Sequence, residues 1–193
     1  MALLGAAACT PISENNASLE EVARAAYRAD GPATVTLFTM VNNRSNEGAH
    51  SALMVSGSER VIFDPAGTWY HPQLPERGDA HYGIQDSVVD FFIDYHARVT
   101  YRVVRHEVQV TQAQADQILA NVRTYGTVGP AFCTNAISQV LRGVPGFEQV
   151  GSTFFPKRMM RNFSALPGAT ERVYRDDDPD NKDFVRARHL RLN

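Results

Sequence analysis

Residues 46–67 read NEGAHSALMVSGSERVIFDPAG, and this stretch predicts a β-hairpin at the centre of a sheet. Two β-rich runs, HSALMV and RVIFD, stand on either side of the turn-forming triplet Ser56-Gly57-Ser58. Both faces of the first run are largely apolar, which is typical of a strand covered on both sides by other elements. We therefore expect the first run to be a central strand and the second run to pair with it.

The same hairpin predicts that a histidine and an aspartate share one face. With the turn at Ser56-Gly57-Ser58, residues whose numbers sum to about 114 lie opposite each other, so His50 faces Asp64. An aspartate in that position accepts a hydrogen bond from one imidazole nitrogen and leaves the other free to take a proton from a thiol. The alternative is a surface hairpin with a weak ion pair.

A candidate nucleophile follows in residues 125–147, YGTVGPAFCTNAISQVLRGVPGF. The Gly-Pro turn brings Cys133 to the first turn of a helix whose apolar face continues to Leu141, and Gly143 ends that helix. Free backbone N–H groups and the helix dipole at such a start favour a thiolate over a thiol, and the same groups can hold an oxyanion. The alternative is an inert, buried cysteine that only fills the core.

The rest of the chain mixes helical and β-rich patterns, which predicts an α+β fold. Further strands are expected at 34–41 and 101–110. Helices are expected from a capping box at Ser18 to Gly31-Pro32, from near Ser87, and from a second capping box at Thr111 to Gly126.

Residues 65–85 hold three prolines and three glycines without any periodic pattern, so we expect a long surface loop. Its aromatic residues suit either a substrate rim or a hydrophobic anchor; they are Trp69, Tyr70 and Tyr82. A metal site is a weaker interpretation of the loop, because its candidate ligands lack the usual ligand spacing. Those candidates are His71, Asp79 and His81.

The order His50, Asp64, Cys133, with the cysteine at the start of a late helix, resembles the circularly permuted papain-like enzymes of the NlpC type. This group includes relatives of lecithin:retinol acyltransferase and bacterial lipoproteins. The resemblance runs from residue 34 to about residue 165, and it includes a closing segment, STFFPKRMMRNFSAL, that is similar to the last helix of the family. Many members have asparagine directly before the cysteine, where this chain has Phe132.

The resemblance implies an antiparallel sheet packed against helices, with the cysteine at a helix N-terminus. It also implies a cysteine hydrolase, an amidase, peptidase or acyltransferase, in which Cys133 attacks a carbonyl and His50 carries the proton. The third residue varies in the family, so Asp64 is chosen here from the hairpin geometry. Such chemistry needs neither a metal nor an organic cofactor.

The amino-terminal stretch MALLGAAACT resembles the end of a bacterial lipoprotein signal, in which the cysteine carries the lipid. On this interpretation residues 1–17 are a signal remnant and tether, Cys9 is a possible membrane anchor, and residues 18–193 form one papain-like domain. A flexible, alanine-rich amino terminus is the alternative. A further alternative is a disulfide between Cys9 and Cys133, the two cysteines of the chain.

Composition limits the possible partners. The formal net charge is −2 and no basic block occurs, so nothing favours nucleic acid. Placement in the bacterial envelope or periplasm predicts a peptidoglycan peptide or a lipid acyl group as substrate. The competing hypothesis is a non-catalytic envelope module that keeps the fold and binds a partner through the aromatic loop.

Overall fold

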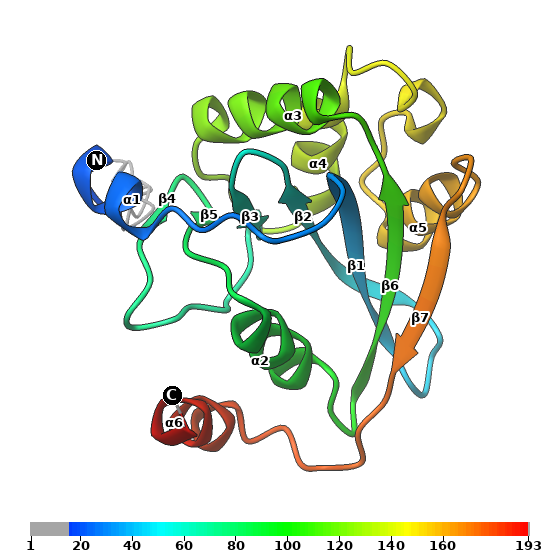
Figure 1. The fold of residues 1–193 in the computed structure, drawn as a ribbon. Coiled ribbons are helices and arrows are strands. Elements are labelled where there is room, and N and C mark those ends of the chain that lie inside the picture. Colours follow the sequence, from blue (N-terminus) through cyan, green and yellow to red (C-terminus); the bar gives the residue numbers. More distant parts are fainter. Residues whose placement is uncertain (1–15, 193) are drawn as a thin grey trace, which may run out of the picture.

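The structure is a computed structural model that describes residues 16–192, and it has an α+β fold (Figure 1). Its seven-stranded sheet has the order β4-β5-β3-β2-β1-β6-β7, and every neighbouring pair is antiparallel. The strands are β1 (Thr34–Asn42), β2 (Gly48–Ser56), β3 (Arg60–Phe63), β4 (Glu76–Arg77), β5 (Ala80–His81), β6 (Tyr101–Gln109) and β7 (Thr170–Tyr174). The helices are α1 (Leu19–Ala25), α2 (Asp86–His96), α3 (Gln112–Tyr125), α4 (Cys133–Leu141), α5 (Pro156–Ser164) and α6 (Lys182–Leu192), with a 3₁₀ turn at Glu148–Val150.

Strand β2 is central, as the sequence predicts. It pairs with β1 on one side and β3 on the other, and its side chains alternate between two buried clusters. Leu53 and Val55 enter one cluster, whereas Ala52 and Met54 enter the other. The two-residue period of a strand therefore places consecutive residues of β2 in cores on opposite faces of the sheet.

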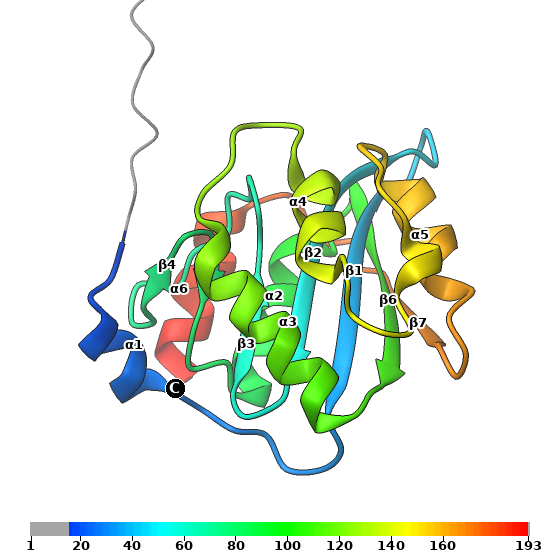
Figure 2. The same cartoon turned by 90° about the horizontal axis from the view of Figure 1, so that it is seen from above.

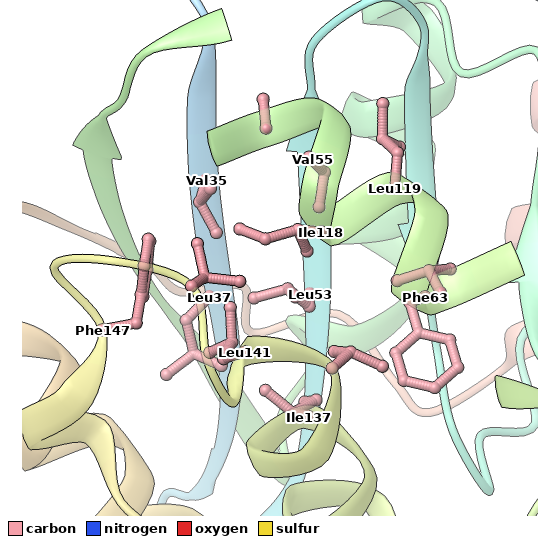
Figure 3. Packing of buried hydrophobic residues seen from close by; sticks show 14 of the residues in the cluster. Val35, Leu37, Leu53, Val55, Phe63, Ile118, Leu119, Ile137, Leu141 and Phe147 are labelled. Carbon is pink, nitrogen blue, oxygen red and sulfur yellow. The ribbon is translucent and has the colours of Figure 1, made fainter. Parts of the chain in front are cut away.

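Helices α3, α4 and α5 cover one face of the sheet (Figures 1 and 2). Ile118 and Leu119 of α3 and Ile137 and Leu141 of α4 meet the side chains of the central strands there (Figure 3). The predicted capping box of α3 is confirmed, because the Thr111 hydroxyl accepts from a backbone N–H of the first turn. Burial of these apolar faces fixes where α4 begins relative to β2.

Helices α2 and α6 lie on the opposite face (Figure 1). The prediction of a helix from near Ser87 is confirmed, since α2 begins at Asp86. The segment before α6 is tied to the end of α2 by Arg98, a buried guanidinium that pairs with Asp94 and with Asp178. This segment therefore carries α6 back over the face of the sheet that α2 covers.

Two expectations need correction. Residues 65–85 are a surface loop only in part: they include the two-residue strands β4 and β5, and they bury Trp69 and Tyr82 because these rings fill the space between the sheet and α2 or α3. The first helix keeps its predicted capping box but ends at Ala25, well before Gly31-Pro32. None of its residues is fully buried, so little packing stabilises a longer helix.

Most of the predicted signal remnant and tether, including Cys9, lies outside the described residues. The expected lipid anchor therefore stays a prediction, whereas the alternative disulfide is not formed, because Cys133 is a free cysteine. Within residues 16–192, no helix combines the length and the apolar character that crossing a membrane requires.

Candidate active site

The hairpin that carries His50 and Asp64 has a different register from the predicted one. Leu53 pairs with Phe63 and Ser56 with Arg60, so the connection spans residues 57–59 and lies one residue further along the chain than expected. His50 is therefore two positions away from the residue opposite Asp64. The two side chains still share a face because a shift of two residues preserves the alternation of a strand.

The histidine and the aspartate make direct contact. The Nε2 atom of His50 lies 2.6 Å from Oδ1 of Asp64, which is a hydrogen bond and, when the imidazole is protonated, an ion pair. The side chain of Asp64 is 1% exposed and that of His50 is 19% exposed. One imidazole nitrogen is thereby committed to a buried carboxylate, while the ring keeps access to solvent.

A tight turn holds Asp64 in this position. Its backbone N–H donates to the carbonyl of Asp79, and its own carbonyl accepts from the N–H of Gly67. Ala66 has a positive φ of 58°, and Gly67 lies directly against the carboxylate, where a Cβ atom would overlap Oδ2 of Asp64. The sequence Asp-Pro-Ala-Gly therefore buries the carboxylate and directs it towards β2.

Cys133 is the first residue of α4, as predicted, and it is a free, buried cysteine. The His50 side chain and the backbone N–H groups of Ser51 and Thr134 lie close enough to its sulfur to lower the pKa of the thiol. The ladder between β2 and β3 ends at Leu53 and Phe63, which leaves that edge of β2 open beside Ser51. The thiol thus reaches the end of the hairpin from the other face of the sheet.

The charges at the site reinforce one another. Burial alone would lower the pKa of His50, but the charge and hydrogen bond of Asp64, helped by Cys133, raise that pKa to about 10. Burial would raise the pKa of the Cys133 thiol, but the hydrogen bond and charge of His50 and the two backbone N–H groups lower it below the ordinary 9.0. Burial likewise opposes ionisation of Asp64, yet the charge and hydrogen bond of His50 lower its pKa.

This arrangement favours a thiolate beside an imidazolium whose other nitrogen is held by a carboxylate. A thiolate is the nucleophilic form of cysteine, and the adjacent imidazolium can return a proton to a leaving group. The structure therefore brings all three predicted residues into one connected group, in an order that acyl transfer requires.

Comparison of the chain with protein-family models, with curated proteins and with solved structures finds no match. The resemblance to the NlpC-type enzymes stays a prediction. What the site can do is therefore argued from its geometry alone.

A cavity of about 420 Å³ adjoins the site on the side of α2 and α6. Its walls include His50, Gly67, Tyr95, His96 and Lys182. A larger hollow, of about 640 Å³, lies between α1 and residues 72–76 and contains none of the three site residues. The smaller cavity is the one placed for chemistry at His50.

The predicted metal candidates have separate partners. Oδ2 of Asp79 accepts from two backbone N–H groups, His81 lies edge-on against Trp69, and His71 contacts His189 of α6. Burial lowers the pKa of both His71 and His81 to about 4, with the charge of His189 adding to the effect at His71. Across the described part of the chain, no three His, Cys, Asp or Glu side chains gather as they would around a metal ion.

The sequence did not lead us to expect that Asp79 links two backbone segments of the site. Its carboxylate bridges the backbone N–H of Ala66, in the turn after Asp64, and that of Val128, in the segment leading to Cys133. One side chain thus joins the two segments that carry the carboxylate and the thiol. The turn-forming pair Gly78-Asp79 was the signal available in the sequence, and in the structure Asp79 has a positive φ of 58°, which aspartate tolerates better than most residues.

The aromatic residues of the segment 65–85 differ in exposure, as the two expected roles, hydrophobic anchor and substrate rim, require. Trp69 and Tyr82 are buried anchors, whereas Tyr70 is exposed, with the Arg186 guanidinium over its ring. Tyr125 packs edge-on against Phe63. These contacts assign Trp69, Tyr82 and Tyr125 to the packing of the fold.

Proposed function

We propose that the protein is a cysteine hydrolase, an amidase or peptidase, or an acyltransferase. The observation that carries this proposal is the grouping of the Cys133 thiol, the His50 ring and the Asp64 carboxylate, in which His50 contacts Asp64 directly and lies close enough to the thiol to lower its pKa. A histidine that only stabilised the hairpin would need the aspartate but not a thiol at a helix N-terminus.

The reaction follows from the positions of these groups. The Cys133 thiolate attacks the carbonyl carbon, forming an S–C bond while the carbonyl oxygen becomes an oxyanion stabilised by backbone N–H groups at the start of α4. The bond to the leaving group then breaks, and His50 gives that group its proton. Water, or a second acyl acceptor, attacks the thioester next, returns a proton to His50 and restores the thiolate.

The substrate class follows from the resemblance and from the proposed envelope location. A peptidoglycan peptide amide is the first candidate, and a lipid ester or amide is the second. Lipid on Cys9 would hold the enzyme at the membrane where either substrate occurs.

The proposal is tested by trapping the acyl-enzyme. Purified protein is mixed with muropeptides or short-chain thioesters, quenched in acid and measured by intact mass, with the Cys133→Ser variant as the matched control. The expected result is an acyl adduct on the wild type that the variant lacks. If no donor of either class acylates Cys133, the fold serves instead as a non-catalytic binding module of the envelope.

A further inference from the structure

The cavity beside His50 lies on one side of the reacting atoms. Its walls come from β2, the turn after Asp64, α2 and the first residues of β6 and α6, and Cys133 is outside them. In acyl transfer, the protonated histidine gives its proton to the departing group. The cavity that borders the histidine, away from the thiol, is therefore placed to hold the leaving group.

Lys182 brings a positive charge to this cavity. It is the first residue of α6, it is partly buried, and its Nζ atom lies 4.6 Å from the centroid of the Tyr95 ring. The ion pairs identified among residues 16–192 do not include Lys182. The aromatic contact orients the ammonium and leaves its donors available to an anion.

Among the polar residues that line the cavity, Lys182 is the one placed to select the charge of the leaving group. Asp180 is exposed, and Oδ2 of its carboxylate accepts from the Thr100 hydroxyl at 2.5 Å. His96 donates through Nδ1 to the Phe92 carbonyl, and burial, with the charges of His50 and Lys182, lowers its pKa to about 4. His96 is therefore neutral near pH 7, while His50 is already paired with Asp64.

We infer that this site is specific for acyl donors whose leaving group carries a carboxylate, which pairs with Lys182 while the scissile carbonyl lies at Cys133. The inference rests on the proposed function. The leaving group departs with a proton from His50, and its carboxylate stays ionised throughout. Lys182 thus acts on binding and orientation of the leaving group and takes no proton in the reaction.

Matched thioesters test this specificity. The donors carry the same acetyl group on mercaptoacetate, 3-mercaptopropionate or 4-mercaptobutyrate, each compared with its carboxamide, so that only the charge and the reach of the leaving group change. Rates of Cys133 acetylation are measured by intact mass in a Cys9→Ser background and divided by the rates of the same donors with free N-acetylcysteine. We expect at least one carboxylate to exceed its carboxamide by about tenfold, as a charge-assisted contact allows.

Two variants of α6 make the assignment specific. Lys182→Met should reduce the carboxylate preference to about one, whereas Arg191→Met, which removes the same charge from an exposed position of the same helix, should retain it. As a readout that needs no turnover, thiol-free carboxylates of the same length, acetate, propionate and butyrate, should slow iodoacetamide labelling of Cys133 in the wild type and in Arg191→Met, but not in Lys182→Met.

The outcomes separate the two proposals. If Cys133 is acetylated by carboxylates and carboxamides at equal normalised rates, or if Lys182→Met keeps the preference, the assignment of Lys182 is wrong and the hydrolase proposal stands. If no donor acetylates Cys133, the hydrolase proposal fails and the specificity inferred here fails with it.

Discussion

Gly67 lies against the carboxylate of Asp64 so closely that a single added methyl group would occupy the position of Oδ2. That oxygen is buried, and among the described residues it has no hydrogen-bond partner, while the other oxygen holds His50. The orientation of the carboxylate therefore depends on a hydrogen bond from one side and on the absence of a side chain on the other.

We predict that Gly67→Ala rotates or displaces Asp64 and weakens its contact with His50. The labelling rate of Cys133 at pH 7 should fall, because the imidazolium that stabilises the thiolate loses its carboxylate. Gly129→Ala is the matched control, since a Cβ atom there meets nothing within 4 Å in the segment leading to Cys133. Equal labelling of the two variants would show that the close approach of Gly67 has no part in the site.

Asp64→Asn should leave the fold intact and lower turnover by orders of magnitude. Loss of the orienting carboxylate in a serine triad reduces turnover by about 10⁴, and the geometry here is analogous. Turnover of the best acyl donor and thermal unfolding are measured together. Asp86→Asn, which removes a largely exposed carboxylate from an ion pair with Arg60, should leave turnover unchanged and change stability by about 0–1 kcal/mol.

The thiol should titrate below its ordinary pKa. In a Cys9→Ser background, the rate of iodoacetamide labelling of Cys133 follows the thiolate fraction, so its inflection should lie below pH 9.0. His50→Ala should move the inflection upwards, because the hydrogen bond and charge that lower the pKa are lost. A wild-type inflection at 9.0 or above, measured by stopped labelling and intact mass, would exclude an activated thiolate.

The pH dependence of stability should reveal the coupling of His50 and Cys133. The pKa of His50 rises from 6.5 to about 10 on folding, so its contribution is complete below pH 6.5 and is lost as the pH approaches 10. The lowered pKa of Cys133 has the opposite effect between its folded pKa and 9.0, and the two contributions oppose each other there.

Removing the thiol should therefore expose the dependence on His50. We expect the unfolding free energy of Cys133→Ser to fall as the pH rises above 6.5, by at most about 1.4 kcal/mol per pH unit. The loss should end below pH 10, because Cys133 no longer helps to raise the His50 pKa. Urea unfolding between pH 6 and 10 measures this, and the double variant Cys133→Ser/His50→Gln should lack that loss; a slope shared by both would contradict the coupling.

Asp79 should contribute to stability and to the placement of the thiol. Asp79→Ala leaves the N–H groups of Ala66 and Val128 without their acceptor and puts alanine at a positive φ, so we expect a loss of about 2 kcal/mol and slower labelling of Cys133. Asp79→Asn keeps an acceptor oxygen and tolerates the conformation, and it should resemble the wild type. Equal losses in the two variants, measured by urea unfolding, would show that the bridge needs the charge.

Local patterns were sufficient to predict α4, the hairpin and the shared face of His50 and Asp64, because these features depend on short periodicities and on turn chemistry. The register was wrong by two positions because the turn is centred on Ser58 and not on Gly57: Ser56 still belongs to β2, and Glu59, which pairs with Arg123 of α3, lies in the connection. The contact of Glu59 with α3 is tertiary, and no local pattern contains it.

The positions of Ser51 beside the thiol and of Lys182 in the wall of the cavity were beyond local prediction for a different reason. The N–H group of Ser51 reaches the sulfur because β3 ends early and α4 crosses the open edge, so its role exists only in the assembled sheet. Lys182 follows His50 by more than a hundred residues and reaches the cavity because Arg98 fixes the returning segment. Burial of an arginine at the end of α2 had no signal in the sequence pattern.

Cys133 begins a helix that packs into one hydrophobic cluster, whereas His50 points to the face covered by the other. The two side chains meet only when both layers of the molecule are in place. A partly folded chain that retains its helices but has lost either core should keep a native-like far-UV circular dichroism spectrum, while the thiol of Cys133 should have the pKa of a free cysteine. The chemistry of a single sulfur atom therefore reports on native packing, and labelling during refolding would time the moment at which the two halves of the fold meet.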